Sequence, residues 1–287
     1  MSQSYLDRLG SRIRRTGTYL CLGIDPDPRT LPEGFSPDIA GVERFARLLL
    51  DAAVEQASAV KVNLAFFEAF GSAGIAALER VRAWIPDDVP FIADAKRGDI
   101  GSTSEQHARA LYDVLDAQAV TANPYLGAEA LAPLLDREDR FVYLLCRTSN
   151  PGAAELQGLE VAADPESGAP AEQLALRVAR RAAGWARHPG TVGLVVGATA
   201  PDELSAVRGT APDLPFLVPG IGSQGGDLAT TLEHGPASQP PGADIPGGAL
   251  LVSISRGIAG AALGAPDPEV ALRIEARLWA ERLQVLG

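Results

Sequence analysis

The sequence predicts an α/β fold, a single (β/α)8 TIM barrel with a short N-terminal helix, as one domain over residues 1–287. Three observations lead to this prediction. Short apolar runs alternate along the chain with segments of helical periodicity. Small or polar residues follow each apolar run, as expected where barrel strands end at the face that carries chemistry. The length of 287 residues also suits one barrel of this kind.

Eight apolar runs have the length and composition of buried strands. In chain order, the expected strands are residues 19–24, 57–62, 91–96, 117–122, 141–146, 192–196, 216–219 and 250–254. Helices are expected where apolar residues recur at helical spacing, over residues 5–15, 42–56, 76–84, from 102 onward, 128–135, 172–187, 202–207, from 227 onward and 266–286. The polar segment 156–170 and the Pro- and Gly-rich segment 233–248 are expected to be loops.

The composition is that of an ordinary globular protein, with 46% hydrophobic and 21% charged residues. A net charge of −11 argues against a general nucleic-acid surface, which needs a basic stripe. We expect no membrane partner and a cytoplasmic location, because no apolar run approaches a membrane span and the N-terminus lacks a signal-peptide pattern. Cys21 and Cys146 lie inside apolar runs, which predicts buried free thiols in a reducing compartment.

The stretch FIADAKRGDIGST, residues 91–103, carries the strongest chemical signal. The chain has 25 basic residues, of which only Lys61 and Lys96 are lysines. Arginine stays protonated, whereas a lysine ammonium can give up a proton when its surroundings move its pKa. Because strand side chains alternate, Asp94 and Lys96 should share one face, while Asp99 lies beyond the strand end. A strand-end salt bridge is the simpler interpretation, but the presence of Asp94, Lys96 and Asp99 within six residues at the end of a buried strand favours chemistry.

Other strand ends add a second carboxylate and an anion site. Asp25 follows the first strand. The seventh strand is followed by the glycine-rich residues 220–227, GIGSQGGD, and the eighth by Arg256. The glycines let the backbone approach a ligand, and a helix beginning near Asp227 would offer amide donors. Barrels of this class bind phosphate after strands 7 and 8, so we expect a phosphate cradle with Arg256 supplying the charge.

Several kinds of chemistry lack their usual signatures. No His or Cys is placed as a nucleophile, no His, Asp and Glu set has metal-ligand spacing, and no dinucleotide-binding or P-loop motif occurs. The sequence therefore predicts proton transfer, or stabilisation of a carbanion, on a phosphorylated substrate without a cofactor or a metal.

The motifs resemble those of the orotidine 5′-phosphate decarboxylases, in the longer bacterial type 2 form of that family. The matching segments span most of the chain in order: LGIDP, the strand with Lys61, DAKRGDIGST, RTSNPG, PGIGSQGGD and SRGI. The resemblance implies conversion of orotidine 5′-phosphate to uridine 5′-phosphate and CO2, the last step of de novo pyrimidine nucleotide synthesis. It also implies that no cofactor takes part.

The resemblance further implies a role for each site residue. An alternating charged array would consist of Lys61, Asp94, Lys96 and Asp99, with Lys96 protonating C6 of the pyrimidine. The substrate would be bound by Asp25 and Lys61 at the ribose hydroxyls, by Ser149 at the pyrimidine and by Gln224 and Arg256 at the phosphate. Thr148 competes with Ser149 for the pyrimidine contact. In a homodimer, Asp99, Ile100 and Thr103 would reach into the partner subunit's site. The Pro- and Gly-rich segment between Gln224 and Arg256 would form a lid over the site, and its sequence does not define the shape of that lid.

Two other hypotheses fit parts of the pattern. A sugar-phosphate lyase or decarboxylase on the same barrel could use Asp94 and Asp99 around a divalent metal. The segment RTSNPG and the lack of a further acidic strand end argue against it. Alternatively, a non-catalytic protein could use the barrel to bind a phosphorylated ligand, in which case Lys96 would not matter for turnover.

Overall fold

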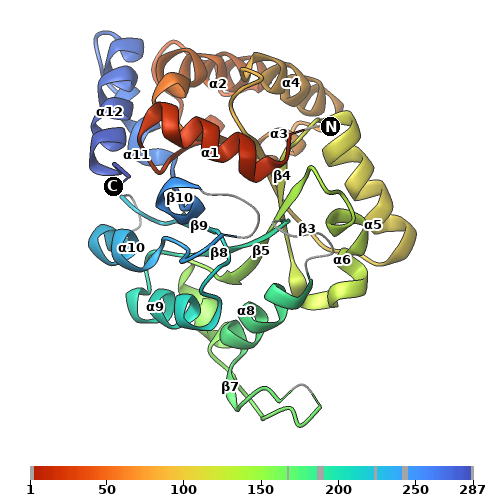
Figure 1. The fold of residues 1–287 in the computed structure, drawn as a ribbon. Helices are drawn as coiled ribbons and strands as arrows, with labels where there is room; N and C mark the ends of the chain where they lie inside the picture. The colour runs from red at the N-terminus through yellow and green to blue at the C-terminus, as the bar shows by residue number, and fades with distance from the viewer. Residues whose placement is uncertain (1–2, 167, 186–190, 223–224, 241–244, 286–287) are drawn as a thin grey trace.

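The computed structural model describes residues 3–166, 168–185, 191–222, 225–240 and 245–285. Within these residues, eight parallel strands close into a barrel in the order β1, β10, β9, β8, β5, β4, β3, β2. Figure 1 shows helices around this barrel. The predicted fold class is confirmed. The barrel strands are β1 (Leu20–Ile24), β2 (Ala59–Asn63), β3 (Phe91–Arg97), β4 (Ala119–Ala122), β5 (Phe141–Arg147), β8 (Val192–Val196), β9 (Phe216–Pro219) and β10 (Leu251–Ile254).

Helices connect the strands, as the alternating pattern predicts. The α-helices are α1 (Tyr5–Thr16), α2 (Ile39–Ala53), α3 (Ala65–Glu68), α4 (Gly71–Trp84), α5 (Gly101–Ala108), α6 (Ala128–Leu135), α7 (Ala154–Gln157), α8 (Leu174–Trp185), α9 (Pro201–Thr210), α10 (Leu228–His234), α11 (Arg256–Ala259) and α12 (Pro268–Arg282). Short 3-10 turns are η1 (Pro28–Thr30), η2 (Val54–Gln56), η4 (Pro124–Leu126), η5 (Pro151–Ala153), η6 (Pro246–Ala249) and η7 (Gly260–Ala262), and η3 (Arg109–Val114) is a π-helical turn.

Helix α1 closes the amino-terminal end of the barrel (Figure 1). It begins where the Ser4 side chain accepts the N–H of Asp7, and it ends at Gly17 with φ +69°. Its apolar face packs on inward-facing strand residues. Members of this apolar floor are Tyr5, Leu6, Leu9, Ile13, Ala59, Ile92, Ala119, Tyr143, Leu217 and Leu251. The floor seals one end of the barrel and leaves the other end for a site.

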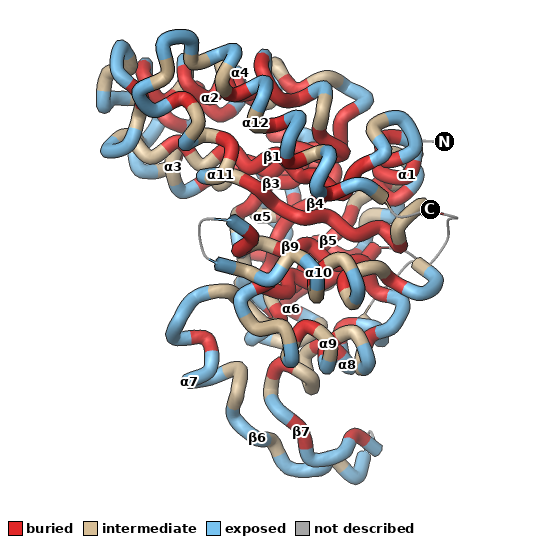
Figure 2. Tube along the Cα trace, turned by 90° about the vertical axis from the view of Figure 1, so that its left-hand side faces the viewer, coloured by how far each residue is buried: buried red, intermediate tan, exposed pale blue. Residues whose placement is uncertain are grey.

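The polar residues of the site lie one inward-facing position beyond this floor. Successive inward side chains on a strand are two residues apart. Ala59 is therefore followed by Lys61, Ile92 by Asp94, and Ala119 by Thr121. A second apolar layer lies between the strands and the outer helices, and the tube in Figure 2 shows buried strands at its centre. The same strands thus supply both the core and the site.

The segment between β5 and α8 differs from the prediction. Residues 156–170 were expected to be one loop, but Glu160–Val161 (β6) pairs antiparallel with Glu172–Gln173 (β7). This hairpin projects from the barrel with a largely exposed surface (Figures 1 and 2). Helix α8 consequently begins at Leu174 rather than at residue 172, because Glu172 is occupied in the hairpin and by ion pairs with Arg177 and Arg180.

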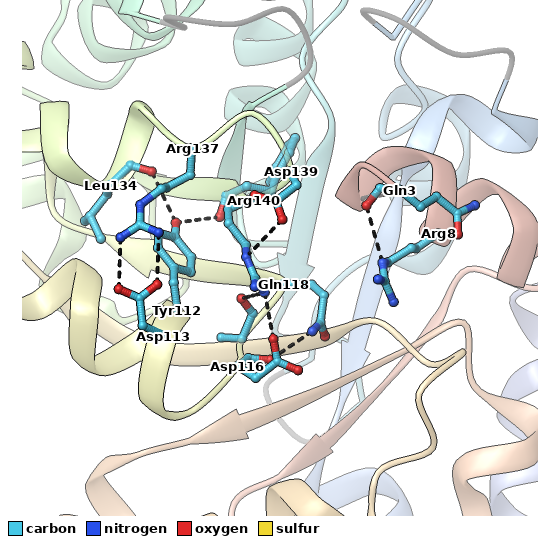
Figure 3. Close-up of polar contacts among 12 residues, drawn as sticks. Gln3, Arg8, Tyr112, Asp113, Asp116, Gln118, Leu134, Arg137, Asp139 and Arg140 are labelled. Carbon is cyan, nitrogen blue, oxygen red and sulfur yellow. Dashed lines mark hydrogen bonds and ion pairs between the residues drawn. The ribbon is translucent and has the colours of Figure 1, made fainter. Parts of the chain in front are cut away.

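Charged residues form a network at the amino-terminal face of the barrel (Figure 3). Asp116 accepts from Arg82 at 2.7 Å and from Arg140 at 3.0 Å, and Arg137 pairs with Asp113 at 2.9 Å. Arg82, Asp116 and Arg140 border a hollow of about 320 Å³. Because its acidic and basic groups largely satisfy one another, we interpret this network as structural.

Two further sequence expectations can be compared with the structure. Cys21 and Cys146 are free and buried, as predicted, and burial raises the pKa of each thiol to about 12. In the described ranges, no helix has the length and apolar character needed to cross a membrane.

Candidate active site

The carboxyl end of the barrel opens into a cavity of about 450 Å³. Six predicted site residues line it: Asp25, Lys61, Asp94, Lys96, Ser149 and Arg256. They come from β1, β2, β3, β5 and β10 or from the segments directly after these strands. The expectation that polar and charged residues at the strand ends gather at one face is therefore confirmed for these six residues.

A row of alternating charges crosses the β2 and β3 side of the cavity. Lys61 Nζ lies 2.9 Å from Asp94 Oδ2, and Lys96 Nζ lies 2.5 Å from Asp94 Oδ1. Lys61 and Asp94 are buried, with 6% and 8% exposure. The Lys96 side chain is 49% exposed and lines the open cavity. Of the two ammonium groups, that of Lys96 is therefore the more accessible to a ligand.

Electrostatic attraction keeps Lys61 and Asp94 ionised. Burial opposes the charge on Lys61, but Asp25 and Asp94 outweigh it and hold the pKa of Lys61 above its ordinary value. Burial likewise opposes the charge on Asp94, but Lys61 and Lys96 outweigh it and hold the pKa of Asp94 well below its ordinary value. A ligand entering the cavity thus meets fixed charges.

Sequence reasoning missed Thr121, which is buried on β4 and lines the same cavity. Its hydroxyl donates to Asp94 Oδ1 at 2.8 Å and accepts the backbone N–H of Lys96 at 2.9 Å. Lys96 has φ +49°, and the pairing of β3 with β4 is irregular between Ala93 and Arg97. Simple strand alternation correctly predicts that Asp94 and Lys96 meet, but the strand there is distorted.

Asp25 lines the cavity and carries one carboxylate oxygen that accepts no hydrogen bond within the described residues. Its Oδ1 is buried without a hydrogen bond, and Lys61 Nζ lies 3.6 Å away. A buried carboxylate oxygen without a donor is costly, so a bound hydroxyl group would improve its environment. Asp25 and Lys61 together therefore form a polar edge suited to a substrate hydroxyl.

The loop after β5 borders another part of the cavity. Gln157 accepts the N–H of Thr148 at 2.8 Å and donates to the Thr148 hydroxyl at 2.8 Å. The Thr148 hydroxyl also donates to Asn150 at 2.6 Å. Among the described residues, the Ser149 hydroxyl has no hydrogen-bond partner, which leaves it available to a ligand.

The loops after β9 and β10 form the opposite side. Gly220 and Ile221 line the cavity, and Gly220 has φ +102°, a conformation open to glycine. Arg256 is exposed and forms no ion pair with any carboxylate in the described part of the chain. Gln224, the other predicted phosphate ligand, lies outside the described residues. One free guanidinium beside a glycine-containing turn suits an anion.

The helix expected near Asp227 is present as α10 and begins with its own anionic cap. Asp227 caps α10 by accepting the N–H of Thr230 at 2.9 Å, so its carboxylate occupies the first helical turn. Asp227 is also absent from the described lining of the cavity. The cap takes up one of the amide donors at the start of α10, and a contribution of this helix to anion binding stays a prediction.

Three predicted residues lie away from the cavity of their own chain. Asp99 accepts the N–H of Ile100 at 2.8 Å, and Thr103 is exposed on α5. Ile100 is 58% exposed, which is unusual for a large apolar side chain.

Within the described residues, no group of three or more His, Cys, Asp or Glu side chains is placed to hold a metal ion.

The family described as orotidine 5′-phosphate decarboxylase / HUMPS matches residues 18–273. The chain belongs to this family. A relative from Thermomicrobium roseum named orotidine 5′-phosphate decarboxylase is 46% identical over 89% of this chain and 86% of the relative. The matched residues include the whole barrel and each of the charged strand ends.

Solved structures extend the likeness to this family's fold. The structure of Leishmania donovani OMP decarboxylase has a TM-score of 0.79 and 37% identity, covering 98% of this chain and 99% of that one. The structure of Leishmania donovani UMP synthase has a TM-score of 0.82 and 39% identity, but this chain covers only 56% of it. The barrel of this chain is therefore that of the orotidine 5′-phosphate decarboxylase / HUMPS family.

Proposed function

We propose that the chain catalyses the decarboxylation of orotidine 5′-phosphate to uridine 5′-phosphate and CO2 in pyrimidine biosynthesis. Membership of the family supports this reaction. The observation that carries it is that the Lys61, Asp94 and Lys96 row shares one cavity with the guanidinium of Arg256, which has no ion pair among the described residues. One part of the cavity suits charge stabilisation at a reacting carbon, and another suits a phosphate.

Lys96 is the proposed proton donor. The bond between C6 and the carboxylate breaks, CO2 leaves, and the electron pair remains on C6. A fixed ammonium beside C6 stabilises that negative charge as it develops. Lys96 then gives its proton to C6, forming the C6–H bond, and recovers a proton from solvent. Its 49% exposed side chain is consistent with that exchange.

Asp94 has two roles in this proposal. Its contact with the Lys96 ammonium at 2.5 Å orients the proton donor. Its negative charge also faces the substrate carboxylate, which raises the energy of the bound substrate relative to the transition state. Lys61, bonded to the other carboxylate oxygen, holds Asp94 in place from the buried side.

The remaining contacts would fix the nucleotide. Asp25 and Lys61 would bind ribose hydroxyls, since both line the cavity and Asp25 Oδ1 accepts no hydrogen bond from the part of the chain that the structure describes. Arg256 would bind the phosphate in a bidentate manner. Ser149 is favoured over Thr148 for the pyrimidine, because the Thr148 hydroxyl already contacts Gln157 and Asn150. Binding energy from the phosphate, far from C6, can then contribute to the rate.

The complete site is proposed to need a homodimer. Asp99, Ile100 and Thr103 follow β3 directly but do not line the cavity of their own chain. We assign them to the cavity of a partner subunit, where Asp99 would add a second carboxylate near Lys96. The exposed Ile100 side chain would become buried in that interface.

Steady-state kinetics of two variants test these assignments. Lys96→Ala should fold normally and lose turnover by about 10³-fold or more, because it removes both the fixed charge and the proton donor. Arg256→Ala should mainly raise KM, by about 10-fold or more, because it removes the phosphate contact. Equal and small effects of both substitutions would contradict the assigned roles.

The same assay distinguishes the proposed decarboxylase from the metal-dependent alternative. Uridine 5′-phosphate formation by the purified protein should persist in the presence of a strong chelator. Loss of activity with chelator, restored by a divalent ion, would instead support the lyase that uses Asp94 with a metal. If Lys96→Ala behaves like the parent protein in this assay, Lys96 has no catalytic role, as the alternative of a non-catalytic phosphate-ligand binder predicts.

A further inference from the structure

We propose that Thr121 is a positioning residue for the reaction, and that its hydroxyl fixes the orientation of the Lys96 ammonium. This inference rests on the proposed function. Thr121 does not need to touch the substrate for this role. It acts through the two residues that it bonds, Asp94 and Lys96.

The strand register brings Thr121 to the level of Asp94. Ile92 on β3 pairs with Ala119 on β4, and Ala93 pairs with Val120. Counting on by one residue places Asp94 beside Thr121, at the start of the irregular stretch between Ala93 and Arg97. Both side chains face into the barrel, where their oxygen atoms lie 2.8 Å apart. The contact is thus built into the sheet.

Three hydrogen bonds close a ring through Thr121. The hydroxyl donates to Asp94 Oδ1, Lys96 Nζ donates to the same oxygen at 2.5 Å, and the Lys96 backbone N–H donates to the hydroxyl at 2.9 Å. The ring therefore joins both ends of Lys96, its backbone and its ammonium, to one point on β4. A free side chain with four rotatable bonds would otherwise have many positions open to it.

The backbone of Lys96 needs this support. Its φ of +49° is in the left-handed region, which L residues with a side chain rarely adopt. Such a conformation persists where surrounding contacts determine it. The Thr121 hydroxyl is the acceptor for the N–H of this strained residue, so it stabilises the irregular end of β3 that points Lys96 into the cavity.

Thr121 also limits the rotation of Asp94. Oδ2 of Asp94 accepts from Lys61, while Oδ1 accepts from Lys96 and Thr121. Without the hydroxyl, Oδ1 would be held only by the partly exposed Lys96 ammonium, and the two could move together. A displacement of about 1 Å at a reacting group can lower a rate by about 100-fold.

A simpler reading is that Thr121 is only a buried hydroxyl whose hydrogen bonds stabilise the fold. Thr18 provides the matched comparison at the other end of the barrel. Its hydroxyl accepts the N–H of Leu20 at 3.2 Å and donates to the carbonyls of Ala280 and Leu283, both at 3.0 Å. Thr18 is equally buried but does not line the cavity.

The test compares kinetics, product affinity and stability for Thr121→Val, Thr121→Ser and Thr18→Val. Thr121→Val should lower kcat by about 10-fold or more, while KM and the Kd for uridine 5′-phosphate stay within about threefold of the parent values. Thr121→Ser retains the hydroxyl and should recover kcat to within about threefold. Thr18→Val should lower the unfolding midpoint while kcat stays within about twofold.

Three results would overturn the inference: a parent-like kcat for Thr121→Val, a failure of Thr121→Ser to recover activity, or a parallel loss of kcat and nucleotide affinity. If Thr121→Val folds poorly by circular dichroism, Thr121→Ala removes the hydroxyl without a second methyl group and is judged by the same criteria. Absence of turnover by the parent protein would count against the proposed function instead, which keeps the two failures distinct.

Discussion

At the scale of single residues, the energetics of the site centre on Asp94 and Lys61. The lowered pKa of Asp94 means that its stabilising effect is complete above its ordinary pKa and is lost as the pH falls through the lower folded-state value. The raised pKa of Lys61 means that its effect is complete below its ordinary pKa and is lost as the pH rises through the higher value. Stability from this pair should therefore be constant between about pH 5 and pH 9.

Replacing Asp94 tests this pairing. Asp94→Asn leaves the buried Lys61 ammonium with Asp25, at 3.6 Å, as its remaining carboxylate. We predict that the free energy of unfolding at pH 7 falls by about 3 kcal/mol, because a buried charge loses its closest partner. Urea denaturation measures the change.

Asp113→Asn is the matched control, because it breaks the half-exposed pair with Arg137. Exposed pairs of this kind contribute less than about 1 kcal/mol. Losses of equal size in Asp94→Asn and Asp113→Asn would show that the buried Lys61–Asp94 pair contributes no more to stability than an exposed pair.

Residue-level prediction from the sequence succeeded where one local rule was enough. The scarcity of lysine and the two-residue period of a strand were sufficient to select Asp94 and Lys96. Thr121 was missed because a threonine in a short apolar strand is an ordinary strand former, and its partners lie on another strand. The left-handed conformation of Lys96 also had no sequence signal, since such positions usually carry glycine.

At the scale of elements, α1 depends on one buried cation. Arg12 is 2% exposed, donates to the carbonyls of Ala57 at 2.9 Å and Val54 at 2.8 Å, and pairs with Asp88 at 2.9 Å. It therefore fastens the helix that closes the barrel floor to the segment between α2 and β2. The apolar periodicity of α1 predicted the helix, but not this anchor, because an arginine near a chain end usually lies in solvent.

We predict that Arg12→Leu lowers the free energy of unfolding by about 3 kcal/mol, since two buried carbonyls lose their donor and Asp88 keeps only its pair with Arg15. Arg15→Ala is the control, because Arg15 contacts the same Asp88 but its side chain is 54% exposed. It should cost less than about 1 kcal/mol. Thermal or urea unfolding of both proteins measures the difference, and equal losses would mean that the buried contacts of Arg12 do not anchor α1.

The barrel elements were predictable because each buried strand is a continuous apolar run between turn residues. Their ends agree with the structure to within a few residues. The β6 and β7 hairpin was not predictable, because its two-residue strands lie in a polar segment without apolar alternation. Helix α8 begins at Leu174 and not at residue 172 as predicted, because residues 172–173 form β7 of that hairpin.

At the scale of the whole molecule, the proposal requires two subunits. Large apolar side chains that follow β3 and β4 are exposed: Ile100, Tyr125 and Leu126. Neighbouring exposed apolar side chains of this kind are typical of a protein interface. The sequence resemblance supplied the expectation of shared residues, since contacts between chains leave no periodic pattern within one chain.

Mixing two inactive proteins tests the shared site. We predict that Asp99→Ala and Lys96→Ala, each nearly inactive alone, recover roughly a quarter of parent activity after subunit exchange, because half of the dimers are mixed and each has one intact site. Lys96→Ala mixed with Asp94→Asn is the control and should recover none, since both residues belong to the same cavity. Absence of recovery despite confirmed exchange would place Asp99 outside the partner's site.

The most direct measurement of the central claim is the stoichiometry of the reaction with the purified protein. Orotidine 5′-phosphate should disappear with equimolar appearance of uridine 5′-phosphate and CO2, and the Lys96→Ala protein should leave the substrate unchanged. An intact parent protein that binds orotidine 5′-phosphate but releases neither product would contradict the account.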